Sequence, residues 1–313
     1  MLSYEPSDIS HKDFHQILLS GVAPRPIAFV STIDANGNCN LSPFSFFNAY
    51  ASKPPVVAIG PAIAAATGKV KDTWKNIMET KECTINAVTY SMVEQMNLAS
   101  TDYEYGIDEF VKAGFHKKQS TAVKPPLVEE SPFSMECSLI NNIELFREEG
   151  GNGNIMLLRV LRLHVKESVL TDGKIDPRKM DFVARMGYKW YSRVTPESCF
   201  ECAQPRVKGI GFDALPQYII ESTVLTGSDL AKLAGVTAIP GVDNDWLQTQ
   251  IVSTADSFEI ELQTNNPAGA LSVLTQNSNL NNRSNLYHRV AQSYLTVGQI
   301  QEAWQTLFLA ERK

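Results

Sequence analysis

Residues 71–73 have the side-chain types that bind an anion. Lys71 supplies a positive charge and Thr73 a hydroxyl, directly before a short helix predicted over residues 74–78. The first backbone amides of a helix have no partner within it and donate to phosphate oxygens. Asp72 is a poor neighbour for a phosphate, and we assign it to capping the helix. The segment therefore predicts a phosphate site at a helix start.

Short polar side chains precede this segment and suit a ligand that carries hydroxyls or amides. They are Ser31, Thr32, Ser45 and Asn48. Between the last two lie Phe46 and Phe47, on a segment interpreted as a loop. These two rings either form the wall of a flat apolar slot or belong to the core, and the sequence leaves both interpretations open.

Arg25 stands between two prolines, Pro24 and Pro26. The following proline disfavours helical backbone at Arg25, so this residue is expected in an extended segment. Two interpretations remain. The guanidinium contacts a ligand, or it forms a surface ion pair, for example with Asp72.

The elements that must position these residues are short strands interspersed with helices. Residues 27–33 and 40–44 predict a hairpin around the turn Asp34–Gly37. Without a regular alternation of strand and helix, the pattern favours an antiparallel barrel that carries helices. Further strands are predicted at 54–59, 83–88, 134–146 and 155–164, further helices at 91–99 and 108–113, and a hairpin loop at 149–154.

Beyond about residue 212 the pattern becomes helical. We predict two domains, residues 1–212 and a helical C-terminal extension at 213–313. Amphipathic helices need an apolar surface, so we expect the extension to pack on the barrel and restrict access to its site. The predicted parts are helices at 216–225, 228–234 and 245–252, a loose linker at 264–284, and a helical hairpin of residues 286–295 and 300–310.

Composition excludes several classes of protein. The 313 residues are 43% hydrophobic, which supports a sizeable core, and the formal net charge of −6 makes a nucleic-acid partner unexpected. The apolar window at 54–67 is too short and too rich in proline to cross a membrane. No basic and apolar leader is visible at the N-terminus, so we expect a cytoplasmic protein. The odd set of five cysteines predicts free thiols.

Other familiar motifs are incomplete. No phosphate loop, dinucleotide fingerprint or serine-hydrolase elbow is present. His11 and His15 have helical spacing but no third metal ligand, so a surface pair is favoured. Cys199 and Cys202 form a single CxxC, which is either redox-active, half of a metal site, or two incidental thiols. His164 ends a strand and is interpreted as structural.

An ordered set of segments over roughly the first 200 residues resembles the flavin reductase-like, FMN-binding split-barrel family, which includes flavoredoxin-like flavoproteins. The set as a whole is more specific than any one motif. The segments are residues 24–32, 40–48, Pro54-Pro55, 71–73 with Asn76-Ile77, 86–88, Asp102-Tyr103, 106–110, 113–115, Glu136-Cys137 and 185–188.

The resemblance implies an antiparallel FMN-binding split β-barrel, mainly β with helices, that forms a cytoplasmic homodimer. It also implies an oxidoreductase in which NAD(P)H transfers hydride to N5 of FMN, with a flavin, another small molecule or a protein redox partner as the electron acceptor. No catalytic side chain and no metal are expected. The implied cofactor-binding residues are Arg25, Ser31, Thr32, Ser45, Phe46, Phe47, Asn48, Lys71, Asp72, Thr73 and Asn76.

Two other functions remain open at this point. The protein is an electron carrier reduced by a protein partner, or a binding module in which the split barrel is a scaffold without redox activity. Fast bleaching of bound flavin by NADH or NADPH excludes the first. A colourless protein that does not take up FMN favours the second.

Overall fold

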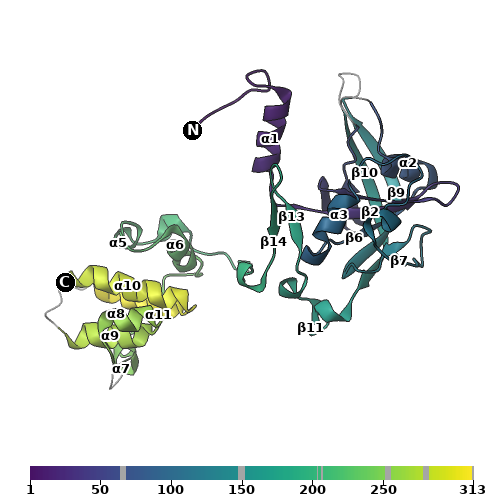
Figure 1. The fold of residues 1–313 in the computed structure, drawn as a ribbon. Coiled ribbons are helices and arrows are strands. Elements are labelled where there is room, and N and C mark those ends of the chain that lie inside the picture. The colour runs from purple at the N-terminus through teal and green to yellow at the C-terminus, as the bar shows by residue number, and fades with distance from the viewer. Residues whose placement is uncertain are drawn as a thin grey trace. The chain divides into compact units, whose positions relative to one another are not determined.

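The computed structural model describes residues 1–63, 68–146, 152–202, 204–205, 207–250, 255–277 and 282–311. It divides into two compact units, Met1–Glu201 and Cys202–Lys313 (Figure 1). The loop predicted at 149–154 lies partly outside the described residues. Among the described residues, no helix is both long and apolar enough to cross a bilayer. The domain boundary predicted at 212/213 stays a prediction.

The first unit is built mainly from strands. Its helices are α1 (His11–Gly21), α2 (Asp72–Thr80), α3 (Val93–Leu98) and α4 (Glu109–Ala113). Its strands are β1 (Arg25–Pro26), β2 (Ala28–Ile33), β3 (Cys39–Phe44), β4 (Phe47–Ser52), β5 (Pro55–Ile59), β6 (Glu82–Asn86), β7 (Lys117–Lys118), β8 (Leu127–Val128), β9 (Phe133–Leu145), β10 (Gly153–Val165), β11 (Leu170–Thr171), β12 (Lys174–Ile175), β13 (Val183–Arg185) and β14 (Tyr191–Arg193).

Seven strands form one antiparallel sheet in the order β3-β2-β6-β9-β10-β5-β4. The predicted hairpin is confirmed, because β2 pairs with β3 through Ala28↔Phe44 to Ile33↔Cys39. The prediction of an antiparallel barrel is confirmed only in part. Edge strands β3 and β4 do not pair with each other in the part of the chain that the structure describes, so the barrel is not closed. Over the whole chain, sheet and helix are mixed.

The sheet nevertheless surrounds a common core. Phe44 on one edge strand and Ile59 near the other edge belong to the same buried cluster as Cys137 on the middle strand β9. On the opposite face of β2, Phe29 packs with residues of α3 and α4, including Phe110. Burial on both faces explains why β2 begins with three consecutive apolar residues, Ala28 to Val30, rather than with an alternating pattern.

The second unit is helical, as predicted. Its helices are α5 (Gln217–Ile220), α6 (Gly227–Ala234), α7 (Trp246–Gln250), α8 (Phe258–Gln263), α9 (Pro267–Gln276), α10 (Arg283–Thr296) and α11 (Ile300–Glu311). They enclose a core that includes Leu233, Tyr294 and Trp304. The structure does not place this unit relative to the first, so its predicted packing on the barrel stays a prediction.

The loose linker predicted at 264–284 is wrong, because helix α9 occupies much of it. Asn266 caps this helix by accepting from the Gly269 amide, and Pro267 takes the first helical position, where its missing N–H costs nothing. Leu271 and Leu274 are buried in the unit core. The cap and the proline are helix signals that the surrounding polar composition concealed. Residues 278–281 lie outside the described residues.

Candidate functional site

Helix α2 begins without a side-chain cap among the described residues. Lys71 occupies the capping position with extended backbone, φ −70° and ψ 141°. The assignment of Asp72 as the helix cap is wrong, because Asp72 is already the first helical residue. A lysine carries no acceptor for the first-turn amides, which stay available to an anion. The chain thus places a cation and unpaired amides together.

A cavity of about 40 Å³, here called the small cavity, opens at this helix start. Lys69 and Lys71 reach it, and both ammonium groups lie near the Asp102 carboxylate. Carboxylates of Asp72 and Glu109 also line it, and burial raises the pKa of Glu109. Four hydroxyls complete the wall, from Ser42, Thr73, Ser100 and Thr101. The cations, amides and hydroxyls are the donors that a phosphate group needs.

A buried hydrogen-bond network holds α2 against the sheet. The Asn40 side-chain amide donates to Thr73 Oγ1 at 2.8 Å and to Thr32 Oγ1 at 3.3 Å, and Asn76 donates to the same Thr32 oxygen at 3.1 Å. All four residues are buried. Thr73 also lines the small cavity, whereas Thr32 and Asn76 position the helix through this network.

Asn40 positions helix α2, and it is not among the cofactor-binding residues that the sequence predicts. Its place in the motif at 40–48 was the available signal, but only the fold brings its amide between β2 and α2. Ser31 is likewise fully buried, and its hydroxyl has no hydrogen-bond partner among the described residues. Contact between Ser31 and a cofactor stays a prediction.

Two further cavities continue from the small cavity. The middle cavity, about 270 Å³, shares Ser100 with the small cavity and Ser45 with the large cavity, which measures about 470 Å³. Ile27, Pro43, Met96 and Tyr191 give the middle cavity an apolar wall. Because neighbouring cavities share a wall residue, the three are adjacent, and we call the row that they form the band. Its lining extends from Lys71 to Asn48.

The predicted residues 45–48 lie together at the large cavity, but not all on a loop. Phe47 and Asn48 begin edge strand β4, because β4 pairs with β5 from Phe47↔Ile59 onward. Phe47 packs on the sheet core, whereas Phe46 is 45% exposed. Gly60 lets the Phe46 side chain approach, because a Cβ there would lie 2.8 Å from Phe46 Cβ. Phe46 is thus the ring more available to a ligand.

Arg25 is buried, with its guanidinium occupied by backbone carbonyls. It donates to the carbonyls of Leu19 at 2.5 Å, Val22 at 2.6 Å and Met186 at 3.1 Å. Burial, followed by the charge of Arg185, lowers its pKa. The surface ion pair with Asp72 is therefore wrong for this structure. Arg25 lines the large cavity while tying the end of α1 to the segment after β13.

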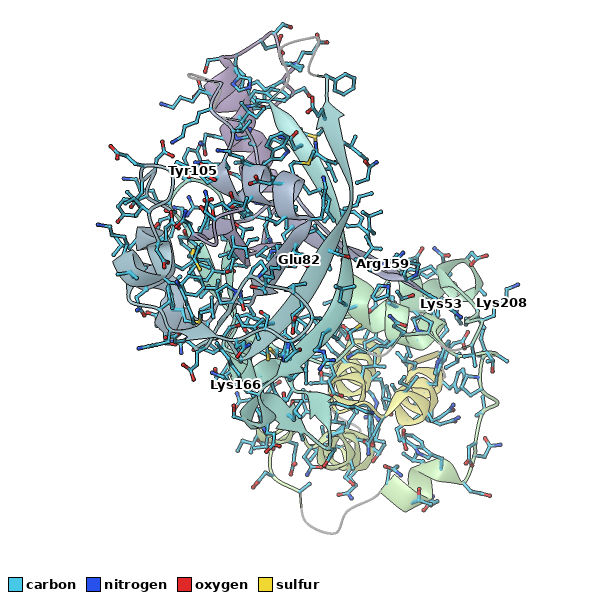
Figure 2. All side chains as sticks on the ribbon, turned by 90° about the vertical axis from the view of Figure 1, so that its right-hand side faces the viewer. Lys53, Glu82, Tyr105, Arg159, Lys166 and Lys208 are labelled. Atoms are coloured by element: carbon cyan, nitrogen blue, oxygen red, sulfur yellow. The ribbon has the colours of Figure 1, made fainter. Side chains whose placement is uncertain are left out.

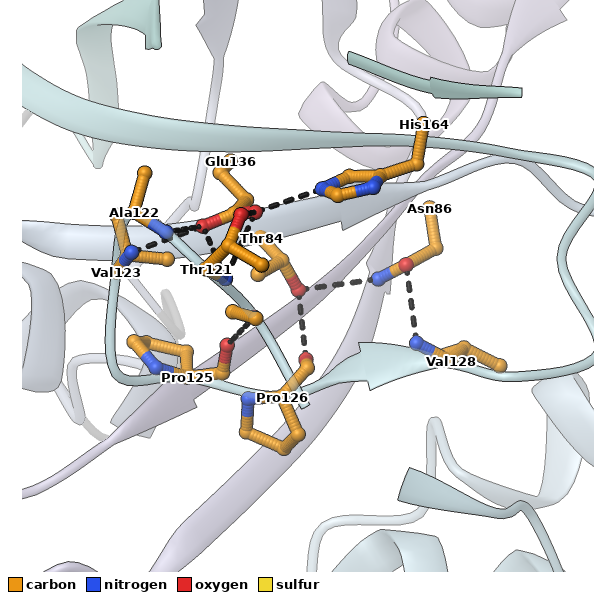
Figure 3. Close-up of polar contacts among 11 residues, drawn as sticks. Thr84, Asn86, Thr121, Ala122, Val123, Pro125, Pro126, Val128, Glu136 and His164 are labelled. Atoms are coloured by element: carbon orange, nitrogen blue, oxygen red, sulfur yellow. Dashed lines mark hydrogen bonds and ion pairs between the residues drawn. The ribbon is translucent and has the colours of Figure 1, made fainter. Parts of the chain in front are cut away.

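A second polar cluster lies on β9 and β10 and is saturated from within (Figure 3). The fully buried Glu136 carboxylate accepts from the amides of Thr121, Ala122 and Val123, and it lies 2.6 Å from His164 Nε2. Burial raises the pKa of Glu136, but these hydrogen bonds outweigh that effect and lower it to about 2. The contact agrees with the structural role predicted for His164.

The remaining motif residues are the histidine pair and the two cysteines of the CxxC segment. His11 and His15 stack with ring centroids 6.0 Å apart, and His15 also lines the large cavity. Cys199 is half-buried and Cys202 exposed. Within the described ranges, no group of three or more potential side-chain ligands is arranged to hold a metal ion.

Comparison with known proteins identifies the first unit. Residues 20–179 match the flavin reductase-like domain, which is half of the chain. The chain belongs to the flavin reductase-like family. An uncharacterized protein of Aquifex aeolicus is 31% identical over 184 residues, 58% of this chain and 91% of the relative. Protein YwrF of Bacillus subtilis is 30% identical over 54% of this chain and 82% of its own.

Solved structures of flavoproteins share the fold. Nitrilotriacetate monooxygenase component B from Bacillus cereus is 28% identical, with a TM-score of 0.61 over 64% of this chain and 98% of its own. The Pseudomonas fluorescens 2-nitrobenzoate 2-nitroreductase is 24% identical, with a TM-score of 0.59 over 67% of this chain and all of its own. A flavin reductase of Shewanella frigidimarina, described as a split-barrel protein, is 24% identical, with a TM-score of 0.55 over 65% of this chain and all of its own.

The flavin reductase-like match contains all of the predicted site residues and ends before the helical unit. The band of cavities therefore belongs to the family domain, apart from His15, Arg185 and Tyr191, which lie outside the matched residues. A flavin-related oxidoreductase is the coarse function that follows from the family. Its cofactor, reductant and acceptor require an argument from the site.

Proposed function

We propose that this protein is an FMN-dependent oxidoreductase that takes hydride from NAD(P)H. The observation that carries the proposal is the row of adjacent cavities from the small cavity, with its phosphate donors, to the large cavity, with its apolar wall. FMN has the same order of parts: a phosphate, a polyol chain and a flat ring. The middle and large cavities also have volumes at or near those that bind small molecules.

Each part of the band has a role in this proposal. The α2 amides, Lys71 and Thr73 hold the phosphate, as expected for an anion at a helix start. Hydroxyls of Ser100 and Ser45 follow along the band and meet the polyol chain. Ser100 already donates to the Asn97 carbonyl and so accepts from the polyol, whereas Ser45 donates to it. Phe46 walls the ring, and Asn48 lies beside it at the edge strand.

The bound flavin supplies the chemistry of hydride and electron transfer. The protein's part is to orient the ring and to exclude water from the face that meets the reductant. Arg25 contributes indirectly, because it fixes the α1 end that borders the large cavity. No side chain is required to act as an acid or base in this step.

We also propose a homodimer, with each band near the contact between two copies. Helix α1 buries none of its residues, and Ile17, Leu18 and Val22 expose apolar surface there. Tyr50 on edge strand β4 is 69% exposed as well. A second copy covering these residues would remove that apolar surface from water. Light scattering of the full chain tests this, and a monomer at micromolar concentration contradicts it.

The experiment that tests the enzymatic proposal is a visible absorption spectrum after reconstitution with FMN, followed by anaerobic NADH and then NADPH. A yellow protein that bleaches rapidly with either nucleotide supports the reductase. A yellow protein that only dithionite reduces supports the electron carrier instead. A protein that stays colourless contradicts both the reductase and the electron carrier. It supports the binding module without redox activity.

A further inference from the structure

The Asp102 carboxylate lies between the two lysines of the small cavity. Its Oδ1 atom is 3.6 Å from Lys69 Nζ and 3.8 Å from Lys71 Nζ. The Asp102 side chain is 70% exposed, and the lysine side chains are 47% and 42% exposed. Asp102 is thus an anion that already occupies the neighbourhood of both cations.

These contacts are loose. Charge-assisted hydrogen bonds between ammonium and carboxylate groups are about 2.7–2.9 Å long, and both distances here are clearly longer. Exposed ion pairs of this kind contribute little to stability, because water screens them and the side chains lose freedom. A doubly charged phosphate with access to the α2 amides makes shorter and more numerous bonds at the same place. The carboxylate is therefore displaceable.

The loop around Asp102 is anchored on both sides, so its side chain can move alone. On one side, the Thr101 amide donates to the Leu98 carbonyl at 3.1 Å. On the other side lies Tyr105 (Figure 2). Its hydroxyl lies 3.3 Å from the Asp34 carboxylate, and the Lys75 ammonium lies 3.7 Å from its ring centre. Rotation of an exposed side chain is fast and needs no rearrangement of the loop.

We propose that Asp102 is a built-in counter-ion that competes with the ligand's phosphate for Lys69 and Lys71. The inference rests on the proposed flavin site and makes that site discriminate by phosphate. In the free protein, Asp102 adds its charge to the carboxylates of Asp72 and Glu109 that also line the small cavity, and its Oδ1 atom lies within 4 Å of both lysine ammonium groups. FMN must displace or outweigh this carboxylate, whereas riboflavin, which lacks the phosphate, does not meet it.

The test measures the Kd of FMN and of riboflavin by flavin fluorescence in four proteins. They are the native chain, Asp102→Asn, Asp102→Glu, and the matched control Glu104→Gln, which removes the same charge from an exposed residue of the same loop outside the small cavity. Asp102→Asn should lower the Kd of FMN about three- to fivefold, the range of an exposed ion pair, and leave that of riboflavin unchanged. Asp102→Glu and Glu104→Gln should bind as the native chain does.

An unchanged FMN Kd in Asp102→Asn overturns the inference. A weaker one also overturns it, because it makes Asp102 a positioning residue for the lysines. If the native chain binds neither flavin, the proposed function fails separately. In that case, inorganic phosphate tests the inference about Asp102. Phosphate should protect Asp102→Asn against thermal unfolding at a lower concentration than it protects the native chain. Equal protection of the two proteins overturns the inference.

Discussion

The small cavity and the Glu136 cluster are both polar, but they differ in what their groups lack. Glu136 is fully buried and accepts from three successive amides and from His164 at the same time. At the small cavity, the first-turn amides of α2 have no side-chain cap, and the lysines share one loosely held carboxylate. The hydrogen bonds of the Glu136 cluster are complete without a ligand. At the small cavity, the first-turn amides of α2 have no side-chain acceptor among the described residues.

The difference separates structural polar groups from functional ones. A motif residue such as Glu136 is as chemically competent as Lys71 when judged by type alone. Buried polar groups must find partners within the fold, so a saturated cluster stabilises the structure. Donors at a surface cavity remain free to bind. Saturation of hydrogen bonding is thus a better guide to the site than residue type.

The largest expected effect comes from Glu136→Ala. Removing the carboxylate leaves the buried amide of Val123 and its neighbours without an acceptor, which should lower the free energy of unfolding by about 3 kcal/mol. Urea denaturation measures this, with exposed Glu129→Ala as a control that changes little. FMN affinity of the folded protein should be unchanged. Loss of FMN binding at native stability would mean that the two clusters are one site.

Lys71→Ala is expected to weaken FMN binding and to change stability little, which is the reverse of Glu136→Ala. Loss of one charge-assisted bond to phosphate should raise the Kd of FMN about tenfold and alter that of riboflavin little. The free energy of unfolding should change by less than about 1 kcal/mol, because the ion pair with Asp102 is exposed. Lys124→Ala, which removes the same charge from an exposed residue of the same unit outside the cavity, is the matched control. Unaltered FMN affinity in Lys71→Ala removes Lys71 from the site.

A smaller effect is expected from acid. The folded state holds the pKa of Glu136 at about 2, below its ordinary value of 4.5. Its contribution to stability is therefore complete above pH 4.5 and is lost as the pH falls toward 2. Urea midpoints at pH 5 and pH 3 should differ less in Glu136→Gln than in the native chain, since both share every other carboxylate. Equal differences in the two proteins would show that Glu136 does not titrate in this way.

Much of the fold could be predicted from local pattern. The turn Asp34–Gly37 between two strand-like segments predicts the β2–β3 hairpin, and the polar start at residues 71–73 predicts helix α2. Prediction failed where local patterns compete. Phe47 was assigned to a loop, but pairing with β5 extends it into strand β4. The Asn and Gln residues around helix α9 predict a linker, although the segment itself is helical.

The sequence predicts which residue types form the candidate site. It does not predict which of them line a cavity and which position helix α2. The sequence by itself determined that Lys71 and Thr73 lie at a helix start, and that short polar residues lie on the segment of β2 and directly after that of β3, since these are local properties. Only the tertiary structure decided that Arg25 is occupied by carbonyls, and that Thr32 and Asn76 position the helix. It also decided that Asp102 reaches both lysines. Burial and the choice of hydrogen-bond partner depend on residues distant in the chain, which no local pattern specifies.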